Sequence, residues 1–234
     1  MKKPIGEIAV YQFEDDTLVL HNDLYQINMA ESYWNDGIHE RNAVFDLYFR
    51  NMPFNSGYAV FNGLKRVIAY INNFHFSESD IKYLKSIGYQ EDFLEYLKDM
   101  KFTGNIRSMQ EGELCFGNEP LLSVEAPLIQ AQLIETMLLN IVNFHTLITT
   151  KASRIKQVAP NDTLMEFGTR RGQEADAALW GARAAYIGGF DSTSNVRAGK
   201  LFGIPVSGTH AHAMVQTYGC LLYTSPSPRD KRQS

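Results

Sequence analysis

The sequence predicts an α/β fold in two parts, an N-terminal α+β domain followed by the first part of an irregular α/β barrel. Three observations lead to this prediction. Short apolar runs broken by turn residues fill residues 104–126, a long helical stripe starts at Pro127, and strand and helix patterns alternate from residue 163 onward. Such alternation is typical of a parallel sheet. We therefore expect one domain over residues 1–126 and the start of the barrel over residues 127–219.

The first elements of the N-terminal part follow from local signals. Residues 17–20 resemble a short strand, and Asn22 or Asp23 can cap a helix that continues to about Trp34. Residues 44–49 alternate between apolar and polar side chains, which predicts a half-buried strand.

Two further helices are predicted before the strand-rich stretch. Ser77 and Asp80 have the spacing of a capping box, which predicts a helix that begins there and ends at Gly88. A second helix is expected over residues 91–100. Gly and Pro then interrupt each apolar run within residues 104–126, so we expect short strands joined by turns.

A long helix is expected to join the two parts. It opens at Pro127 and places its apolar side chains on one stripe. The loops that leave the carboxyl ends of parallel strands converge on the active site of a barrel, so residues 168–172 and 208–212 should share one face. The sequence predicts a strand at residues 163–167, helices at 173–187 and 194–202, and a strand at 204–207. Each of the two loops comes directly after one of these strands.

Residues 220–234 differ in style from the rest of the chain. The segment has no periodicity and no apolar face, and it resembles the translation of an adapter used in DNA library preparation. We therefore treat it as a non-native-looking tail and exclude it from the fold prediction.

Composition predicts a soluble, cytoplasmic protein. The 234 residues are 44% apolar, which allows a substantial core, and the net charge of -4 argues against a nucleic-acid partner. No stretch approaches the roughly 18 consecutive apolar residues of a membrane span, so no membrane partner is expected. Cys115 and Cys220 are too few for a disulfide framework, and Cys115 in a strand-like run fits an inert core position.

A histidine in the second predicted loop is a candidate for catalysis. His212 follows a strand within the run Gly-Thr-His-Ala-His, where an imidazole can act as a nucleophile and backbone N–H groups can bind phosphate. A structural or helix-capping histidine fits the same pattern. His210 and His212 lack a third ligand at suitable spacing, so no metal site is predicted.

An arginine and a tyrosine are candidates for substrate binding. Arg170 follows a buried-looking strand, and its guanidinium suits a carboxylate, which it can bind through two parallel hydrogen bonds. The simpler alternative is a surface ion pair with Glu174 or Asp176. Tyr25, in the first turn of its helix, fits a core position equally well.

Four segments together resemble the nicotinate phosphoribosyltransferase family. They contain Asn-Asp-Leu-Tyr-Gln, Glu-Phe-Gly-Thr-Arg-Arg-Gly-Gln, Gly-Gly-Phe-Asp-Ser-Thr-Ser-Asn and Gly-Thr-His-Ala-His, at residues 22–26, 166–173, 188–195 and 208–212. The resemblance implies a type II phosphoribosyltransferase fold, of which this chain would be the N-terminal, incomplete portion. It also implies that ATP phosphorylates His212 and that Tyr25, Arg170 and Thr209 help to hold nicotinate.

The reaction that the resemblance implies joins nicotinate to phosphoribosyl pyrophosphate, giving nicotinate mononucleotide and pyrophosphate in NAD biosynthesis. ATP hydrolysis would be coupled through the phosphohistidine, Mg²⁺ would assist the phosphates, and the full-length protein would be a homodimer. Arg170 would favour the pyridine carboxylate over a neutral amide, and Tyr25 would stack on the ring.

Two alternatives remain open from the sequence. A related phosphoribosyltransferase could use nicotinamide or quinolinate instead of nicotinate. An inactive truncated fragment could act only as a binding or dimerising module. We expect residues 1–234 alone to have no phosphoribosyltransferase activity, because the family chain continues into further barrel strands and phosphate-binding loops.

Overall fold

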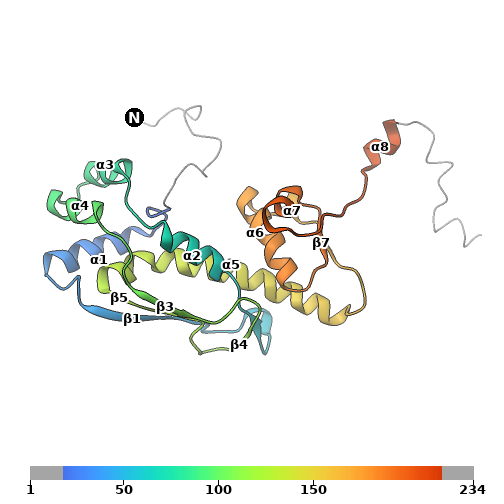
Figure 1. The fold of residues 1–234 in the computed structure, drawn as a ribbon, viewed down its shortest axis with the longest axis horizontal. Helices are drawn as coiled ribbons and strands as arrows, with labels where there is room; N and C mark the ends of the chain where they lie inside the picture. The colour runs from blue at the N-terminus through green and yellow to red at the C-terminus, as the bar shows by residue number, and fades with distance from the viewer. Residues whose placement is uncertain (1–17, 218–234) are drawn as a thin grey trace, which may run out of the picture.

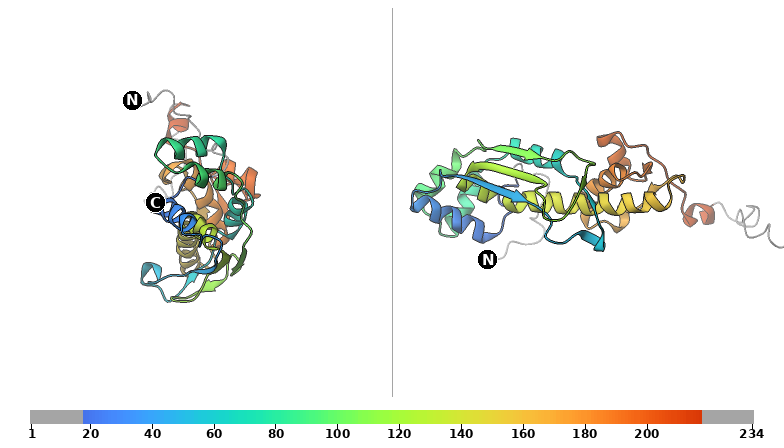
Figure 2. Two further views of the ribbon diagram at one scale, coloured as in Figure 1. Left: turned by 90° about the vertical axis from the view of Figure 1, so that its left-hand side faces the viewer. Right: turned by 90° about the horizontal axis from the view of Figure 1, so that it is seen from below.

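One long helix organises the molecule. The structure is a computed structural model that describes residues 18–217, and it consists of two lobes joined by helix α5 (Leu128–Val158) (Figure 1). We call residues 18–127 the N-terminal lobe and residues 163–217 the C-terminal lobe. Figure 2 shows α5 running along one face of the sheet of the first lobe and continuing into the second. The predicted long helix is therefore confirmed, with Pro127 at its N-cap.

The sheet of the N-terminal lobe has three antiparallel strands in the order β1-β5-β3. They are β1 (Asn42–Leu47), β3 (Asn105–Ser108) and β5 (Leu122–Pro127), and a second pair is formed by β2 (Ala59–Val60) and β4 (Leu114–Cys115). Alternate residues of β5 are buried, because successive side chains of a strand point to opposite faces and one face packs on α5. The predicted strands in this stretch are confirmed.

Helices cover the rest of this lobe, and their starts are set by local contacts. They are α1 (Leu24–Asn35), α2 (Leu64–Asn72), α3 (Glu78–Ser86) and α4 (Glu91–Lys98), with a short 3₁₀ turn, η3, at Pro53–Asn55. The capping box at α3 is confirmed: the Asp80 N–H donates to Ser77 Oγ at 3.2 Å, and the Ser77 N–H donates to Asp80 Oδ2 at 2.8 Å.

The beginning of the described chain corrects one prediction. Leu18 to Leu20 form a turn rather than a strand, closed by a 3.0 Å hydrogen bond from the His21 N–H to the Leu18 carbonyl. Leu18 has a φ of 53°, which lies in the left-handed region and is incompatible with a strand. Residue 17 and the tail 220–234 lie outside the described residues.

The C-terminal lobe contains the predicted parallel sheet. Strands β6 (Met165–Glu166) and β7 (Ser192–Thr193) are parallel, and Val206 adds a parallel bridge to Thr193. Among the strands of this lobe, only β7 was not predicted; it lies between β6 and Val206. The strand expected at residues 204–207 is reduced to the bridge at Val206. The helices are α6 (Glu174–Ile187), α7 (Val196–Phe202) and α8 (His212–Thr217), with a 3₁₀ turn, η4, at Thr169–Arg171. The mixed α/β fold class is confirmed.

The two lobes bury apolar side chains differently. The N-terminal lobe and α5 share one large cluster that includes Phe61, Phe93 and Leu133, whereas the C-terminal lobe has a cluster of Leu179, Ala182, Ala198 and Ile204. Cys115 is fully buried in β4, as expected, and burial raises the pKa of its thiol to about 11. Within residues 18–217, none of the helices combines the length and apolar character needed to cross a membrane.

Candidate active site

The register of the parallel strands brings two predicted loops to one edge of the sheet. The Ser194 N–H donates to the Glu166 carbonyl at 2.9 Å, and the Ser207 N–H donates to the Thr193 carbonyl at 3.0 Å. The chain therefore leaves all three strands at the same carboxyl edge. The loops that carry Arg170 and Thr209 begin there, as expected for a barrel.

Arg170 lies in the turn η4 directly after β6. The N–H groups of Arg171 and Gly172 both donate to the Gly168 carbonyl at 2.8 Å, which closes the turn. The Arg170 side chain is exposed, and among the described residues no ion pair involves it. The surface ion-pair alternative with Asp176 is wrong, because that carboxylate binds Arg66 at 2.5 Å. Arg170 is thus available to an anion from outside the chain.

Glu166, Phe167 and Thr193 lie at the same edge, but sequence reasoning gave none of them a role of its own. Glu166 Oε2 accepts a 2.7 Å hydrogen bond from Thr193 Oγ1, and its Oε1 accepts from the Gly168 N–H, so one carboxylate joins β7 to the Arg170 turn. Phe167 exposes 45% of its surface beside that turn, although it is apolar. An aromatic residue at the end of the predicted strand 163–167, next to the Arg170 loop, is the sequence signal that could have identified Phe167.

The second loop carries Thr209 and ends at His212. Both side chains are exposed, and His212 is the first residue of α8, which stands away from the sheet (Figure 1). Within residues 18–217, no hydrogen bond joins residues 208–212 to the Arg170 turn. The structure therefore brings the two loops to one edge but leaves His212 apart from Arg170.

Tyr25 lies in the other lobe. It is 53% exposed, so the core interpretation is wrong, and its hydroxyl accepts a 3.0 Å hydrogen bond from Gln26 Nε2. The side chain lines a hollow of about 410 Å³ beside α5, together with Asp23, Tyr48 and Glu135. None of the residues that line this hollow comes from the C-terminal lobe, so within residues 18–217 the hollow does not join Tyr25 to Arg170.

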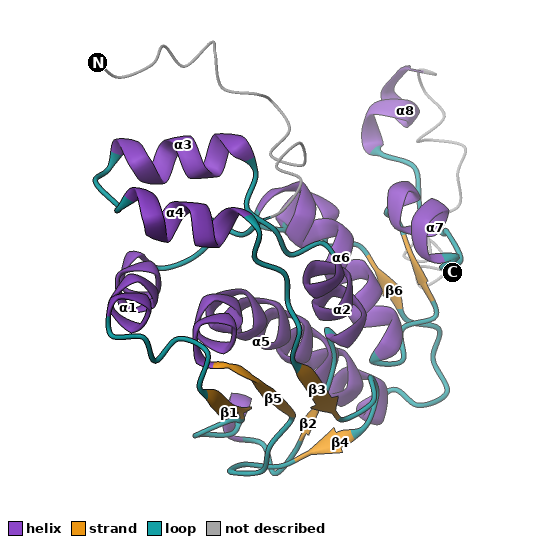
Figure 3. Ribbon diagram, turned by 60° about the vertical axis from the view of Figure 1, so that its left-hand side comes forward, coloured by secondary structure: helices purple, strands orange, loops and turns teal. Residues whose placement is uncertain are grey.

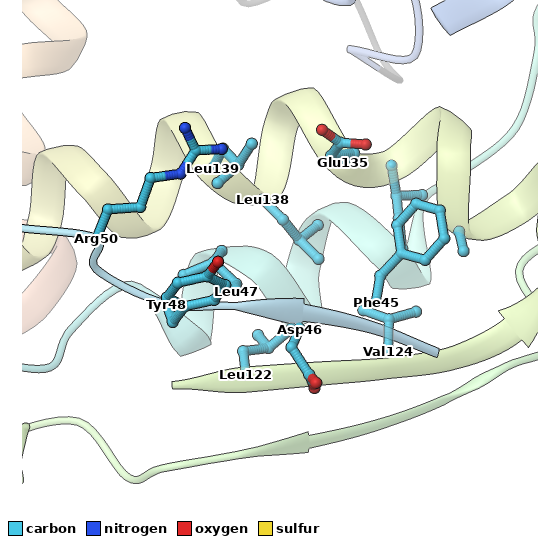
Figure 4. A pocket seen from close by; sticks show the side chains of 12 residues that line it. Phe45, Asp46, Leu47, Tyr48, Arg50, Leu122, Val124, Glu135, Leu138 and Leu139 are labelled. Atoms are coloured by element: carbon cyan, nitrogen blue, oxygen red, sulfur yellow. The ribbon is translucent and has the colours of Figure 1, made fainter. Parts of the chain in front are cut away.

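A second hollow, of about 300 Å³, lies between α5 and the sheet. Figure 4 shows its apolar walls from Leu47, Val124 and Leu138, with the charged side chains of Arg50 and Glu135 near the rim. It contains none of the predicted site residues. Among residues 18–217, no three His, Cys, Asp or Glu side chains gather closely enough to hold a metal ion.

Comparison with known proteins shows the family of this chain. The model of the nicotinate phosphoribosyltransferase (NAPRTase) N-terminal domain matches residues 20–143. The chain belongs to the nicotinate phosphoribosyltransferase family. The match covers β1 to β5 and ends within α5.

Individual relatives of this chain agree with the family assignment. It is 65% identical to nicotinate phosphoribosyltransferase of Bacillus subtilis (strain 168) over 89% of this chain and 43% of that protein. It is 44% identical to the Caenorhabditis elegans protein of the same name, over 87% of this chain and 37% of that one. The chain thus spans less than half the length of these relatives.

Two solved structures share the fold. Human nicotinic acid phosphoribosyltransferase superposes with a TM-score of 0.79 and 39% identity, over 84% of this chain and 40% of that chain. Nicotinate-nucleotide pyrophosphorylase from Pyrococcus furiosus has a TM-score of 0.70 at 24% identity, over 94% and 48% of the two chains, and supports the fold alone. These likenesses agree with the predicted fold of a type II phosphoribosyltransferase.

Proposed function

We propose that this chain supplies part of the substrate site of a nicotinate phosphoribosyltransferase, which forms nicotinate mononucleotide and pyrophosphate from nicotinate and phosphoribosyl pyrophosphate. The parallel register that brings the Arg170 and Thr209 loops to one edge carries this proposal. The 65% identity to the Bacillus subtilis enzyme supports it.

Arg170 binds the nicotinate carboxylate in this proposal. Its exposed guanidinium has no competing carboxylate within the described chain, and two parallel hydrogen bonds select a planar anion over a neutral amide. Thr209 adds a hydroxyl from the neighbouring loop. The exposed ring of Phe167 lies at the same edge and offers an apolar surface to a flat heterocycle.

His212 receives a phosphoryl group from ATP in this proposal. Its imidazole is exposed on the loop side of α8, where an attacking nitrogen is accessible to a nucleotide. Phosphorylation adds negative charge close to the pyrophosphate-binding region, which would reorganise the loop and couple ATP hydrolysis to substrate binding. Mg²⁺ would be held chiefly by the phosphates of the substrates.

Tyr25 joins the site from a second copy of the protein in this proposal. It stacks on nicotinate, yet it lies in the N-terminal lobe and lines a hollow to which the C-terminal lobe contributes nothing. A homodimer that places the N-terminal lobe of one copy against the sheet edge of the other would bring Tyr25 to Arg170. The separation of these two residues within one chain thus supports the dimer.

The test is an assay of the protein encoded by the complete reading frame, defined by a long sequencing read across the codon for Gly219. We expect product from nicotinate, little from nicotinamide or quinolinate, and transfer of label from γ-labelled ATP to the protein. His212→Ala should abolish that label, and His210→Ala should retain it. Preference for the amide or the diacid would reject the proposed substrate, and label retained by His212→Ala would reject the phosphohistidine.

A further inference from the structure

A layer of charged and polar side chains lies between the two lobes, away from the loops described above. Arg66 of α2 binds Asp176 of α6 at 2.5 Å, and Arg183 of α6 binds Glu111, in the turn before β4, at 2.5 Å. Figure 3 shows α2 beside α6. Both ion pairs therefore connect the N-terminal lobe to the same helix.

The Glu111 end of this layer is fixed by several donors. One carboxylate oxygen of Glu111 accepts the N–H groups of Gly63 and Lys65, each at 3.1 Å, at the start of α2. Burial alone would raise the pKa of Glu111, but its bonds to Arg183 and to these amides lower it overall. Arg183 also donates to Asn62 Oδ1 at 3.3 Å. The far half of α6 is thus held to a rigid part of the N-terminal lobe.

The Asp176 end lies next to the Arg170 turn. Asp176 is in the first turn of α6, which begins directly after that turn. Gly172 packs so closely on α6 that an added Cβ would lie 2.9 Å from the Cα of Ala178. Glu174, at the junction, has a φ of 77°, a left-handed conformation that costs energy in a residue other than glycine. The position of the turn therefore depends on contacts that hold the start of α6.

Arg66 is the residue that supplies those contacts from the other lobe. Besides the bond to Asp176, its guanidinium lies 4.8 Å from the centre of the Trp180 ring, one helical turn further along α6. A half-buried ion pair contributes little net stability, because desolvation offsets the attraction, but it can fix a relative position. Arg66 has the geometry for that second role.

We infer that Arg66 is a positioning residue for the Arg170 turn, acting through Asp176, so that the N-terminal lobe sets part of the affinity for the nicotinate carboxylate. This inference rests on the proposed function. Arg66 does not contact the substrate. Loss of its guanidinium lets the start of α6 and the strained junction shift, and the two hydrogen bonds from Arg170 then no longer match the carboxylate.

Steady-state kinetics of the complete protein test this inference with Arg66→Met, Asp176→Asn and the double variant. We expect KM for nicotinate to rise about tenfold, with kcat changed less than about twofold, because ground-state and transition-state binding are lost together. The double variant should be no worse than Arg66→Met, since both changes break one contact. Arg66→Lys should recover only part of the loss, because it restores the charge without the planar group.

A matched control comes from the opposite edge of the same sheet. Lys156 forms a half-exposed ion pair with Asp191 at 3.5 Å, before β7 rather than after β6. Lys156→Met should leave KM for nicotinate unchanged. An equal rise in this control, or no rise in Arg66→Met, would overturn the inference.

Hydrogen exchange of residues 168–176 gives a second readout that does not need activity. Exchange should become faster in Arg66→Met and Asp176→Asn and stay unchanged in Lys156→Met. If the unsubstituted enzyme makes no nicotinate mononucleotide, the proposed function fails, while exchange still decides whether Arg66 positions the turn. If Arg66→Met does not fold, the nearly isosteric Asp176→Asn carries both measurements.

Discussion

The N-terminal lobe and the C-terminal lobe rest on hydrophobic clusters of very different size. In the first, side chains from the sheet, from four helices and from α5 form one continuous core. In the second, four buried residues and Phe202 make the whole apolar cluster within the described chain. The second lobe therefore depends on α5 and on the ion pairs to the first lobe. Its loops carry the candidate site where independent stability is lowest.

A pair of matched truncations tests this comparison and should give the largest effect. Phe93 is fully buried in the large cluster, and Phe93→Ala should lower the free energy of unfolding by about 4 kcal/mol. Leu179→Ala, in the small cluster, should cost about 2 kcal/mol, because its surroundings can relax toward solvent.

Chemical denaturation followed by circular dichroism measures both changes, and hydrogen exchange locates them. Leu179→Ala should speed exchange in α6 and α7 while leaving α3 and α4 protected. Loss of protection in both lobes at once would contradict the idea that the C-terminal lobe opens separately.

The contact between the lobes should respond to acid through His145 of α5. This side chain is fully buried against Trp180, and within the described chain its ring nitrogens have no hydrogen-bond partner. Burial, together with the smaller effects of the Arg66 and Arg183 charges, lowers its pKa from 6.5 to about 4, and the charge of Glu111 acts in the opposite direction. The folded protein therefore keeps His145 neutral where the unfolded chain would protonate it.

The direction in which stability changes with pH follows from proton binding. Between the ordinary pKa of 6.5 and the folded value of about 4, the unfolded state binds one more proton, so stability falls as the pH falls through this window. From about pH 7.5 to about pH 5, the contribution of His145 is about 2 kcal/mol. His145→Leu should remove that part of the pH dependence, measured as the difference between denaturation midpoints at the two pH values. An unchanged pH dependence would show that other groups control it.

The capping box of α3 should give the smallest effect, because it lies at the surface of the lobe with the larger core. Ser77→Ala removes the acceptor for the Asp80 N–H and should cost about 1 kcal/mol. Gln90→Ala is the matched control, since Gln90 occupies the N-cap of α4 without a side-chain capping bond. Equal losses in the two variants would show that the box contributes nothing of its own.

Sequence patterns predicted the elements that are determined by residues close together in the chain. The α3 cap, the start of α5 at Pro127 and the alternation in β1 each depend on residues a few positions apart, and all three are confirmed. Strand β7 was missed because it is only Ser192 and Thr193, and its strand character comes from pairing with β6 and Val206. A two-residue strand carries no periodicity.

The residues of the candidate site likewise divide into those that the sequence predicted and those that depend on distant contacts. Arg170 was predicted because it follows a strand, whereas Thr209 was predicted only from the family resemblance. The structure places their loops at one edge. Glu166 and Arg66 were missed because their partners, Thr193 and Asp176, lie 27 and 110 residues away in the sequence. No local pattern can report such contacts. The roles assigned to Tyr25, Arg170, Thr209 and His212, and the domain boundary after residue 126, stay predictions.

The shared helix also decides how this protein can be divided for co-expression or split-reporter work. α5 supplies the wall of both lobes: Thr150 Oγ1 receives the Val60 N–H on one side, and Ala152 packs on Gly188 on the other. A cut inside α5 would strip one lobe of its support. A break in the exposed turn at residues 159–163 instead keeps α5 whole, so the C-terminal piece should fold only when it docks on that helix.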